Sequence, residues 1–220
     1  MKEIIKAILP EYVVTKIKEL RNPFPGSQKY WEDRYSKGGN SGAGSYNNLA
    51  KFKAEVLNDF VRKNNVKTII EFGCGDGNQL TLAEYPDYTG FDVSSTALEI
   101  CKKLFFNDKK KHFLLLGDYT NQTAELTLSL DVIYHLVEYK IYEQHIRQLF
   151  SAAEKFVIIY AHDNDKRANF HEKTRKFTRF ISDNISNWQL LEHIPNKYPY
   201  TGEDSENTSC SDFFIYERKL

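Results

Sequence analysis

The chain has 220 residues, which is the length of one ordinary domain. Hydrophobic residues make up 41% of it and charged residues 27%, a composition that excludes a disordered, collagen-like or membrane-spanning protein. Thirty Lys and Arg residues balance thirty Asp and Glu residues, so no long-range field favours binding to nucleic acid or anionic lipid. We therefore expect no nucleic-acid partner, and the composition predicts no membrane span. For the oligomeric state we expect a monomer or a homodimer.

The three cysteines, Cys74, Cys101 and Cys210, include no Cys-x-x-Cys pair. An odd number without such a pair indicates neither a disulfide framework nor a structural zinc site. We expect a reducing, cytoplasmic compartment.

Apolar residues at helical spacing predict an amphipathic helix over residues 1–20, kinked near Pro10. Charged residues and Pro10 interrupt the apolar core that a signal peptide needs, so we expect the segment to remain in the mature protein. Its polar face mixes lysines with glutamates, whereas binding to anionic lipid needs a clearly basic face. Packing on the domain or on a second chain is therefore favoured.

Residues 22–46 mark a boundary, where two prolines precede an aromatic and basic cluster and a glycine-rich run. A flexible linker is one interpretation, but a linker has no need of large rigid side chains. We predict a helical cap and glycine-rich lid over residues 1–48, which closes over a ligand, and a binding domain over residues 49–220. The cluster consists of Tyr30, Trp31, Arg34 and Tyr35.

From residue 49 onward, segments of helical length alternate with short apolar runs. Such alternation indicates crossover connections and a parallel sheet with helices on both faces. The last two runs are separated only by a polar loop, which predicts a C-terminal antiparallel hairpin. The fold class is thus α/β, Rossmann-like, with a mostly parallel seven-stranded sheet. The expected strands lie within residues 67–73, 88–93, 112–118, 128–135, 155–161, 187–194 and 211–219.

Residues 71–78, Glu-Phe-Gly-Cys-Gly-Asp-Gly-Asn, form a glycine-rich turn that follows a buried strand and is predicted to open a helix. Gly73 allows a tight turn, Gly75 lets backbone N–H groups approach a ligand, and the helix offers its positive end to a carboxylate or phosphate. Asp92 ends the second strand, where its carboxylate can accept both hydroxyls of an adenosine ribose. The sequence therefore predicts a nucleotide-type site.

The position of the third glycine distinguishes a dinucleotide site from a site for another nucleotide-type cofactor. A dinucleotide site needs Gly or Ala three positions after the second glycine, but this chain has Asn78 there and its third glycine at Gly77. Glu71 and Asp76 would repel a pyrophosphate and suit a positively charged ligand. The chain has no Gly-Lys-Ser/Thr sequence, which excludes a Walker-type phosphate loop. The pattern acidic-x-Gly-x-Gly-x-Gly resembles the first motif of class I S-adenosylmethionine (SAM)-dependent methyltransferases. An NAD-dependent oxidoreductase and a non-catalytic SAM-binding subunit are the alternatives.

The resemblance implies S-adenosyl-L-methionine as cofactor and S-adenosyl-L-homocysteine (SAH) as product. It also implies acids after the second, third and fourth strands, and Asp92, Asp118 and Asp131 occupy these places in the expected order. With the aromatic cluster of the lid, the motifs predict a set of cofactor-binding residues: Tyr30, Trp31, Arg34, Glu71, Gly73, Cys74, Gly75, Asp76, Gln79, Asp92, Val93, Asp118, Tyr119, Asp131 and Val132.

Over residues 28–220 the combined pattern resembles a smaller bacterial group associated with surface-polysaccharide biosynthesis, namely of capsule or lipooligosaccharide. That resemblance implies methylation of a sugar hydroxyl or a phosphate-type oxygen on a small-molecule or glycan-precursor acceptor. The segments that carry it are WEDRY, GGNSGAGSY, FGCGDGNQL, SLDVIYHLVE, IIYAHDND and SDFFIYER.

Methyl transfer from a sulfonium is an in-line displacement that requires alignment of donor and acceptor and removal of one proton. His135 follows the fourth strand at the ligand-binding edge of the sheet, and its ordinary pKa of about 6.5 suits that proton removal. We predict His135 as the catalytic base, with Glu138 orienting its ring. A histidine that only hydrogen-bonds the loop is the alternative. The segment lacks the Asn/Asp-Pro-Pro-aromatic motif of many amine methyltransferases, which favours an oxygen acceptor.

Residues 165–180 form the most basic region and, if helical, place His171, Arg175 and Arg179 along one side. This row suits an anionic acceptor, although a solvated helix face is equally typical of such a run. A cluster of His162, Asp163 and Asp165 matches no strong metal signature, so no metal site is predicted. The predicted substrate-binding residues are Tyr46, Tyr134, His162, His171 and Arg175.

Overall fold

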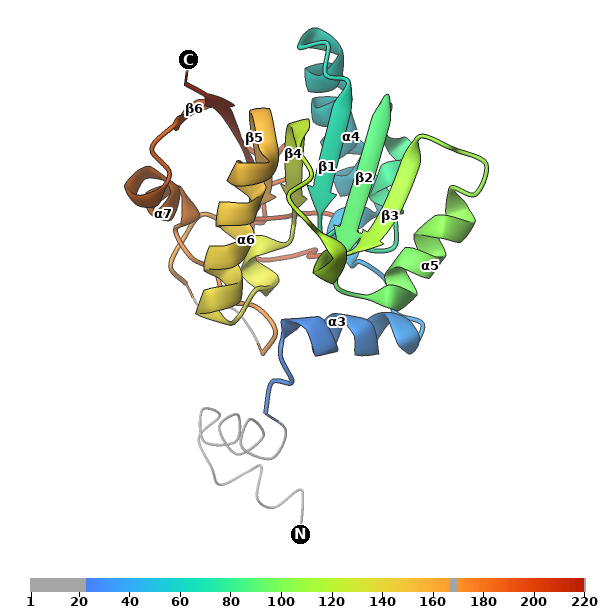
Figure 1. Cartoon of the computed structure of the whole chain (residues 1–220). Coiled ribbons are helices and arrows are strands. Elements are labelled where there is room, and N and C mark those ends of the chain that lie inside the picture. Colours follow the sequence, from blue (N-terminus) through green and yellow to red (C-terminus); the bar gives the residue numbers. More distant parts are fainter. Residues whose placement is uncertain (1–22, 167–169, 220) are drawn as a thin grey trace, which may run out of the picture.

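The computed structural model describes residues 23–166 and 170–219 (Figure 1). The predicted N-terminal helix of residues 1–20 lies outside the described residues. A strand forms at each of the seven predicted places, although the fourth begins at Ala124 and ends at Leu130, so that the predicted residues 133–135 form the 3-10 helix η4 (Ile133–His135) instead. The strands are β1 (Thr68–Phe72), β2 (Asp87–Asp92), β3 (Lys111–Leu115), β4 (Ala124–Leu130), β5 (Ala153–Ala161), β6 (Trp188–Ile194) and β7 (Asp212–Arg218).

The strands make one sheet in the order β3-β2-β1-β4-β5-β7-β6. The first five strands pair in parallel, and β7 lies antiparallel between β5 and β6. Parallel neighbours need long crossover connections, which the intervening helical segments supply. The predicted Rossmann-like α/β class, with its antiparallel C-terminal strands, is confirmed.

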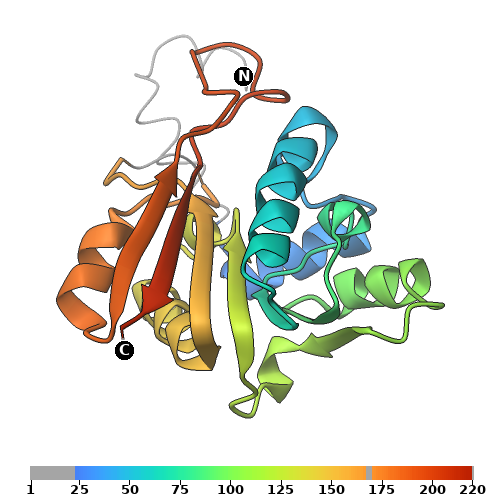
Figure 2. The ribbon, with the colours of Figure 1, turned by 90° about the horizontal axis from the view of Figure 1, so that it is seen from above.

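Helices cover both faces of the sheet, as Figure 2 shows: α4 and α5 pack on one face, and α6 and α7 on the other. Within the described part of the chain, no helix combines the length and apolarity that crossing a membrane requires. The helices are α3 (Ser27–Ser36), α4 (Asn47–Lys63), α5 (Ser95–Leu104), α6 (Tyr139–Ala152) and α7 (Phe177–Asn184).

The alternation of side chains along β1 divides the interior into two apolar cores. Ile69 belongs to the core under α4 and α5, whereas Ile70 and Phe72 belong to the core under α6 and α7. Each such buried side chain contributes about 1.5–3 kcal/mol relative to an exposed one. A strand covered on both faces is apolar at successive positions, which explains the apolar run, interrupted only by Glu71, that predicted it.

The helix predicted to follow the glycine-rich turn does not form. Only the 3-10 helix η2 (Gln79–Leu82) lies there, because Pro86 and the start of β2 at Asp87 leave too few residues for an α-helix. So short an element has no appreciable dipole, and the predicted positive helix end is wrong. Binding at the turn must rest on side chains and on the shape of the backbone.

The helix predicted over the basic region 165–180 begins only at Phe177; Arg167 to Asn169 lie outside the described residues. Residues 170–176 instead run along the loop after β4, where the Lys173 N–H donates to the Tyr134 carbonyl at 2.7 Å. Asp163 accepts the N–H and hydroxyl of Thr178 in the first turn of α7, at 3.1 and 2.7 Å. The predicted row of His171, Arg175 and Arg179 on one helix face is therefore wrong.

Candidate active site

A cavity of about 540 Å³ lies at the carboxyl ends of β1 to β4. The strand order reverses between β1 and β4, and such a switch point is where open α/β sheets bind ligands. Figure 1 shows α3 crossing this edge of the sheet, so it closes one side of the cavity. Volumes of this size accommodate cofactor-sized ligands.

Most of the predicted cofactor-binding residues line the cavity: Trp31, Glu71, Gly73, Cys74, Gly75, Gln79, Asp92, Val93, Asp118, Asp131 and Val132. Tyr30, Arg34, Asp76 and Tyr119 do not line it. Tyr119 packs edge-on against Phe72 and Phe91, with ring centroids 5.3 and 5.4 Å away, and so contacts the cavity only through Phe72, which lines it.

The glycine-rich turn shapes the cavity through its backbone. Gly73 has φ of 89°, and a Cβ atom there would lie 2.5 Å from Val132 Cγ2. The N–H of Gly75 was expected to face a ligand, but it donates to Asp92 Oδ2 at 2.9 Å. The Ser94 N–H donates to Asp92 Oδ1 at 2.9 Å, so two amides fix the orientation of this carboxylate.

The carboxylate of Asp92 retains the capacity to bind hydroxyl groups. Each carboxylate oxygen offers about two lone-pair sites, and one backbone amide occupies a single site on each oxygen of Asp92. Burial raises the pKa of Asp92, with the backbone hydrogen bonds opposing that shift. Because the group lies at the end of β2 and lines the cavity, its geometry suits paired ribose hydroxyls.

Asp76 binds residues at the two ends of the segment 41–46 and does not line the cavity. Its Oδ2 accepts the Ser41 N–H and the Tyr46 hydroxyl, both at 2.9 Å. In return, the Asp76 N–H donates to Ser41 Oγ at 3.0 Å. Burial, together with the hydrogen bond to the Asp76 carboxylate, raises the pKa of Tyr46 to about 12. Neither Tyr46 nor Asp76 lines the cavity.

The start of α3 is tied to the loop after β4. Glu138 accepts the Ser27 N–H at 2.9 Å and the Ser27 hydroxyl at 2.6 Å. The predicted orientation of the His135 ring by Glu138 is thus replaced by a contact that holds the cap on the domain. Trp31 consequently faces the cavity, while Arg34 donates to the Asn40 carbonyl at 2.6 Å and supports the glycine-rich run.

His135 lines the cavity beside Trp31, with ring centroids 4.9 Å apart. Its Nδ1 lies 3.3 Å from the carbonyl oxygen of His171. A carbonyl only accepts, so Nδ1 carries the proton and Nε2 keeps its lone pair. Burial lowers the pKa of His135 to about 3, far below the ordinary value that the sequence implied, and the ring is neutral at physiological pH.

Four other predicted substrate residues do not line the cavity, namely Tyr134, His162, His171 and Arg175. Tyr134 stacks on His162 at 4.5 Å, and Tyr30 stacks on His171 at 4.7 Å. Arg175 donates to the carbonyls of Leu136 and Val137 at 2.8 and 2.7 Å, which fixes the loop after β4. The expected anion clamp is absent from the described residues because this guanidinium already serves the backbone.

One group of described side chains brings together atoms that are able to ligate a metal. His135, His171 and Glu172 each offer one ligand atom, and these atoms lie within 4.8 Å of one another. His162, Asp163 and Asp165 do not form such a group among the described residues; Asp163 accepts from Thr178, and Asp165 accepts the Lys176 N–H at 2.9 Å.

Sequence reasoning missed Lys53, which lines the cavity from α4 and pairs with Asp131 at 2.8 Å. The sequence pattern could have indicated that Lys53 is buried. It lies four residues from both Leu49 and Leu57 and so falls on the apolar face of the helix. Also missed were several polar residues of the cavity wall: Ser27, Gln28, Gln144, His145 and Gln148.

Two buried acceptors in the lining suit a ligand with positively charged or N–H groups. Glu71 accepts the Tyr88 hydroxyl at 2.6 Å, and burial raises the pKa of Glu71 to about 7. Gln79 donates to the Ala50 carbonyl at 3.0 Å, while its buried Oε1 has no hydrogen-bond donor among the described residues. Buried acceptors are normally satisfied, so these atoms indicate a ligand that donates.

The switch-point cavity and its ribose-type carboxylate define a Rossmann-like domain that binds a nucleotide-type cofactor. The profile of a family described as a methyltransferase domain matches residues 46–201, and the chain belongs to this family. A search of curated proteins found no match.

Solved structures with the same fold include several methyltransferases. N-methyltransferase NodS from Bradyrhizobium japonicum WM9, in complex with SAH, has a TM-score of 0.68 at 15% identity, covering 88% of this chain and 98% of its own. Magnesium protoporphyrin IX methyltransferase from Synechocystis PCC 6803, with bound SAH, has a TM-score of 0.59 at 15% identity, covering 77% and 83%. The mitomycin 7-O-methyltransferase MmcR has a TM-score of 0.55 at 12% identity, covering 76% and 54%. At these identities the likeness shows the fold alone.

Proposed function

We propose that the protein transfers the methyl group of SAM to an oxygen atom of a small-molecule or glycan-precursor acceptor. Membership of the methyltransferase family and the SAM- or SAH-bound relatives support the cofactor. The observation that carries the proposal is the cavity itself. Two backbone amides orient Asp92 there, and no described residue donates a hydrogen bond to the buried Gln79 Oε1. Asp92 would hold the ribose, and Asp118, after β3, would lie near the adenine.

Bound SAM supplies a methyl group that already carries its leaving group. The task of the protein is then to align the acceptor and to manage one proton. Nδ1 of His135 donates to the His171 carbonyl, and no described residue donates to its Nε2, so the lone pair of Nε2 can accept a proton. We assign His135 as the base that receives the acceptor proton. Trp31, beside it, excludes water from that end of the cavity.

The acceptor class rests on the resemblance to polysaccharide-modifying enzymes and on the chemistry near His135. A sugar hydroxyl has to lose its proton as it attacks, and a neutral imidazole suits that step. A phosphate-type oxygen is already ionised and would need no base. Arg175 is committed to backbone carbonyls, so this guanidinium gives no support to an anionic acceptor.

The decisive experiment is turnover of a library of sugar nucleotides, glycan precursors and phosphorylated metabolites with SAM labelled in its methyl group. We expect mass spectrometry to find the label in an oxygen-linked methyl ester or ether. Label in an N-methyl product would refute the oxygen acceptor. Titration calorimetry with SAH and NAD separates the two cofactor hypotheses, and SAH binding without turnover of any acceptor would favour the non-catalytic subunit.

A further inference from the structure

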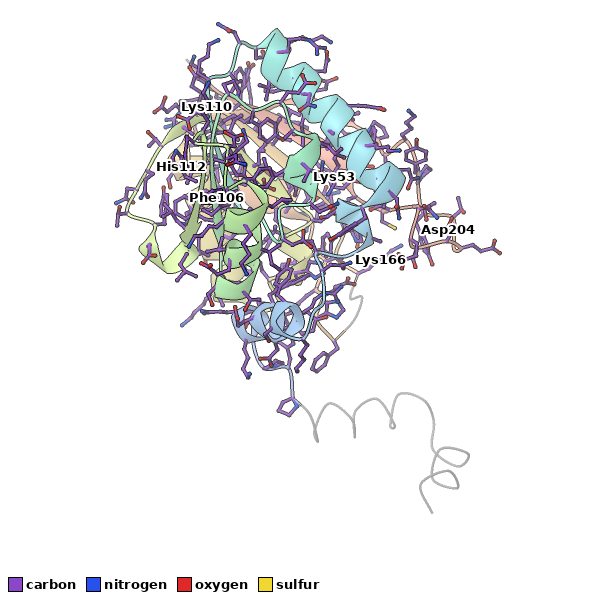
Figure 3. All side chains as sticks on the ribbon, turned by 90° about the vertical axis from the view of Figure 1, so that its right-hand side faces the viewer. Lys53, Phe106, Lys110, His112, Lys166 and Asp204 are labelled. Atoms are coloured by element: carbon purple, nitrogen blue, oxygen red, sulfur yellow. The ribbon has the colours of Figure 1, made fainter. Side chains whose placement is uncertain are left out.

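Lys53 is a buried cation whose hydrogen-bonding capacity is largely unused. Its residue is 0% exposed, and Figure 3 shows its side chain on the side of α4 that faces the sheet. The ammonium lies 2.8 Å from Asp131 Oδ2 and 5.2 Å from the centre of the Tyr160 ring. An ammonium has three N–H donors, and in the described ranges Asp131 is its only hydrogen-bond acceptor.

Its partner is already satisfied, in contrast. Asp131 accepts from Lys53, from the Tyr134 hydroxyl at 3.0 Å and from the Ser211 hydroxyl at 2.9 Å. Burial opposes ionisation of this carboxyl, but the Lys53 ammonium and these hydrogen bonds hold the pKa of Asp131 below its ordinary value. The pair is therefore neutral overall, with spare donors on the cation and little spare capacity on the anion.

Spare donors on a buried cation are unfavourable unless something else accepts them. The cavity is the available source of that acceptor, because Lys53 lines it together with Asp131 and Glu71. A ligand group that pairs with Lys53 must therefore be an acceptor, and an anion would suit the ammonium best.

The strand order shows which part of the cofactor reaches Lys53. Asp92 follows β2 and Asp118 follows β3, so the ribose and adenine occupy that half of the sheet edge. The methionine half must extend the other way, past β1 toward β4. Neighbouring strands lie about 4.8 Å apart, so the end of β4 is about 10 Å from that of β2. Asp131 directly follows β4, and Lys53 is its ion-pair partner at 2.8 Å.

We propose that Lys53 binds the carboxylate of the methionine half of SAM. The ammonium of the methionine half then binds Glu71 and Gln79 Oε1, which also line the cavity; no described residue donates to Gln79 Oε1. Lys53, Glu71 and Gln79 thus complement an amino-acid zwitterion, and the tie of Lys53 to Asp131 sets the position of its ammonium. The proposal rests on SAM as the cofactor and is independent of the acceptor.

Decarboxylated SAM, which keeps the ammonium and lacks only the carboxylate, isolates the predicted contact. Titration calorimetry measures the dissociation constants of SAM and of this analogue for the parent protein, for Lys53→Met and for Lys51→Met, an exposed control on the same helix. A hydrogen bond to a charged group contributes enough to expect a preference for SAM of roughly 10- to 100-fold in the parent and in Lys51→Met. In Lys53→Met we expect that preference to fall to about one. The variant has no ammonium for the carboxylate of SAM, so the missing carboxylate of the analogue costs no further affinity.

Lys53→Met leaves Asp131 buried without its cation, so the variant risks unfolding. The double variant Lys53→Met/Asp131→Asn removes both charges and should show the same lost preference. A preference for SAM that persists in either variant overturns the proposal. Equal weakening of both ligands also overturns it, because Lys53 would then act only as a structural ion pair. If the preference persists but the acceptor KM rises, the cation serves the acceptor. Failure of the parent protein to bind either ligand would instead refute the cofactor assignment.

Discussion

Replacement of His135 by asparagine tests the chemistry proposed for the cavity. Asparagine keeps a polar side chain of similar size but cannot take up the acceptor proton. General-base catalysis is worth about 10²- to 10⁴-fold, and a base is most effective when its pKa lies near the working pH. Because burial lowers the pKa of His135 to about 3, we expect a loss in kcat at the lower end, about 10²-fold. The dissociation constant of SAM should be unchanged.

The pH dependence of kcat gives an independent measure. A base works in its unprotonated form, which is lost only as the pH falls through its pKa. With a pKa of about 3 for His135, kcat should stay level as the pH is lowered, whereas a histidine at the ordinary value of 6.5 would lose most of its activity between about pH 8 and pH 5.

The matched control is His112→Asn, since His112 is an exposed histidine on β3, away from the cavity lining. Turnover of His135→Asn equal to that of the control would remove the base assignment. An acidic limb near pH 6.5 in the parent, absent from His135→Asn, would keep the base but refute the burial argument. A loss of kcat in His135→Asn, with no acidic limb in the parent, supports both the base assignment and the lowered pKa.

Asp92→Ala should weaken SAH binding by about 1.5–3 kcal/mol in calorimetry, because the ribose hydroxyls lose a charged acceptor; unchanged affinity would contradict the ribose assignment. Asp76→Ala should lower the free energy of unfolding by about 1–3 kcal/mol in urea, since the Ser41 N–H and Tyr46 hydroxyl lose their acceptor, and an unaltered transition would show that the lid is held by other contacts. Deletion of residues 1–46 should abolish tight SAH binding while circular dichroism still reports a folded sheet, and normal affinity in the truncated protein would reduce the glycine-rich run to a linker. Turnover should survive a chelator if His135 acts as a base; loss of activity that Mn²⁺ or Zn²⁺ restores would assign His135, His171 and Glu172 to a metal instead.

The order of elements followed from local periodicity. Short apolar runs predicted the strands and apolar residues at spacings of three to four predicted most of the helices, because each element must turn one face or both toward the interior. The glycine-rich turn and Asp92 were placed correctly at the carboxyl ends of β1 and β2, since parallel crossovers bring those ends to a single edge. Local patterns gave a wrong prediction in two places. Too few residues separate the glycine-rich turn from β2 for an α-helix, so only η2 forms, and residues 170–176 hydrogen-bond to the loop after β4 instead of forming a helix.

Which partner each polar group takes was decided only by the tertiary structure. Asp76 binds Ser41, Glu138 binds Ser27 and Lys53 binds Asp131, and these pairs are separated by 35, 111 and 78 residues. Sequence spacing places a charged residue on an element and near one of its ends. It carries no information on which distant segment folds back to that end. A buried charge takes whichever partner packing brings within hydrogen-bond distance, and so the lid anchors and the cavity cation became visible only once α3 and α4 were in place on the sheet.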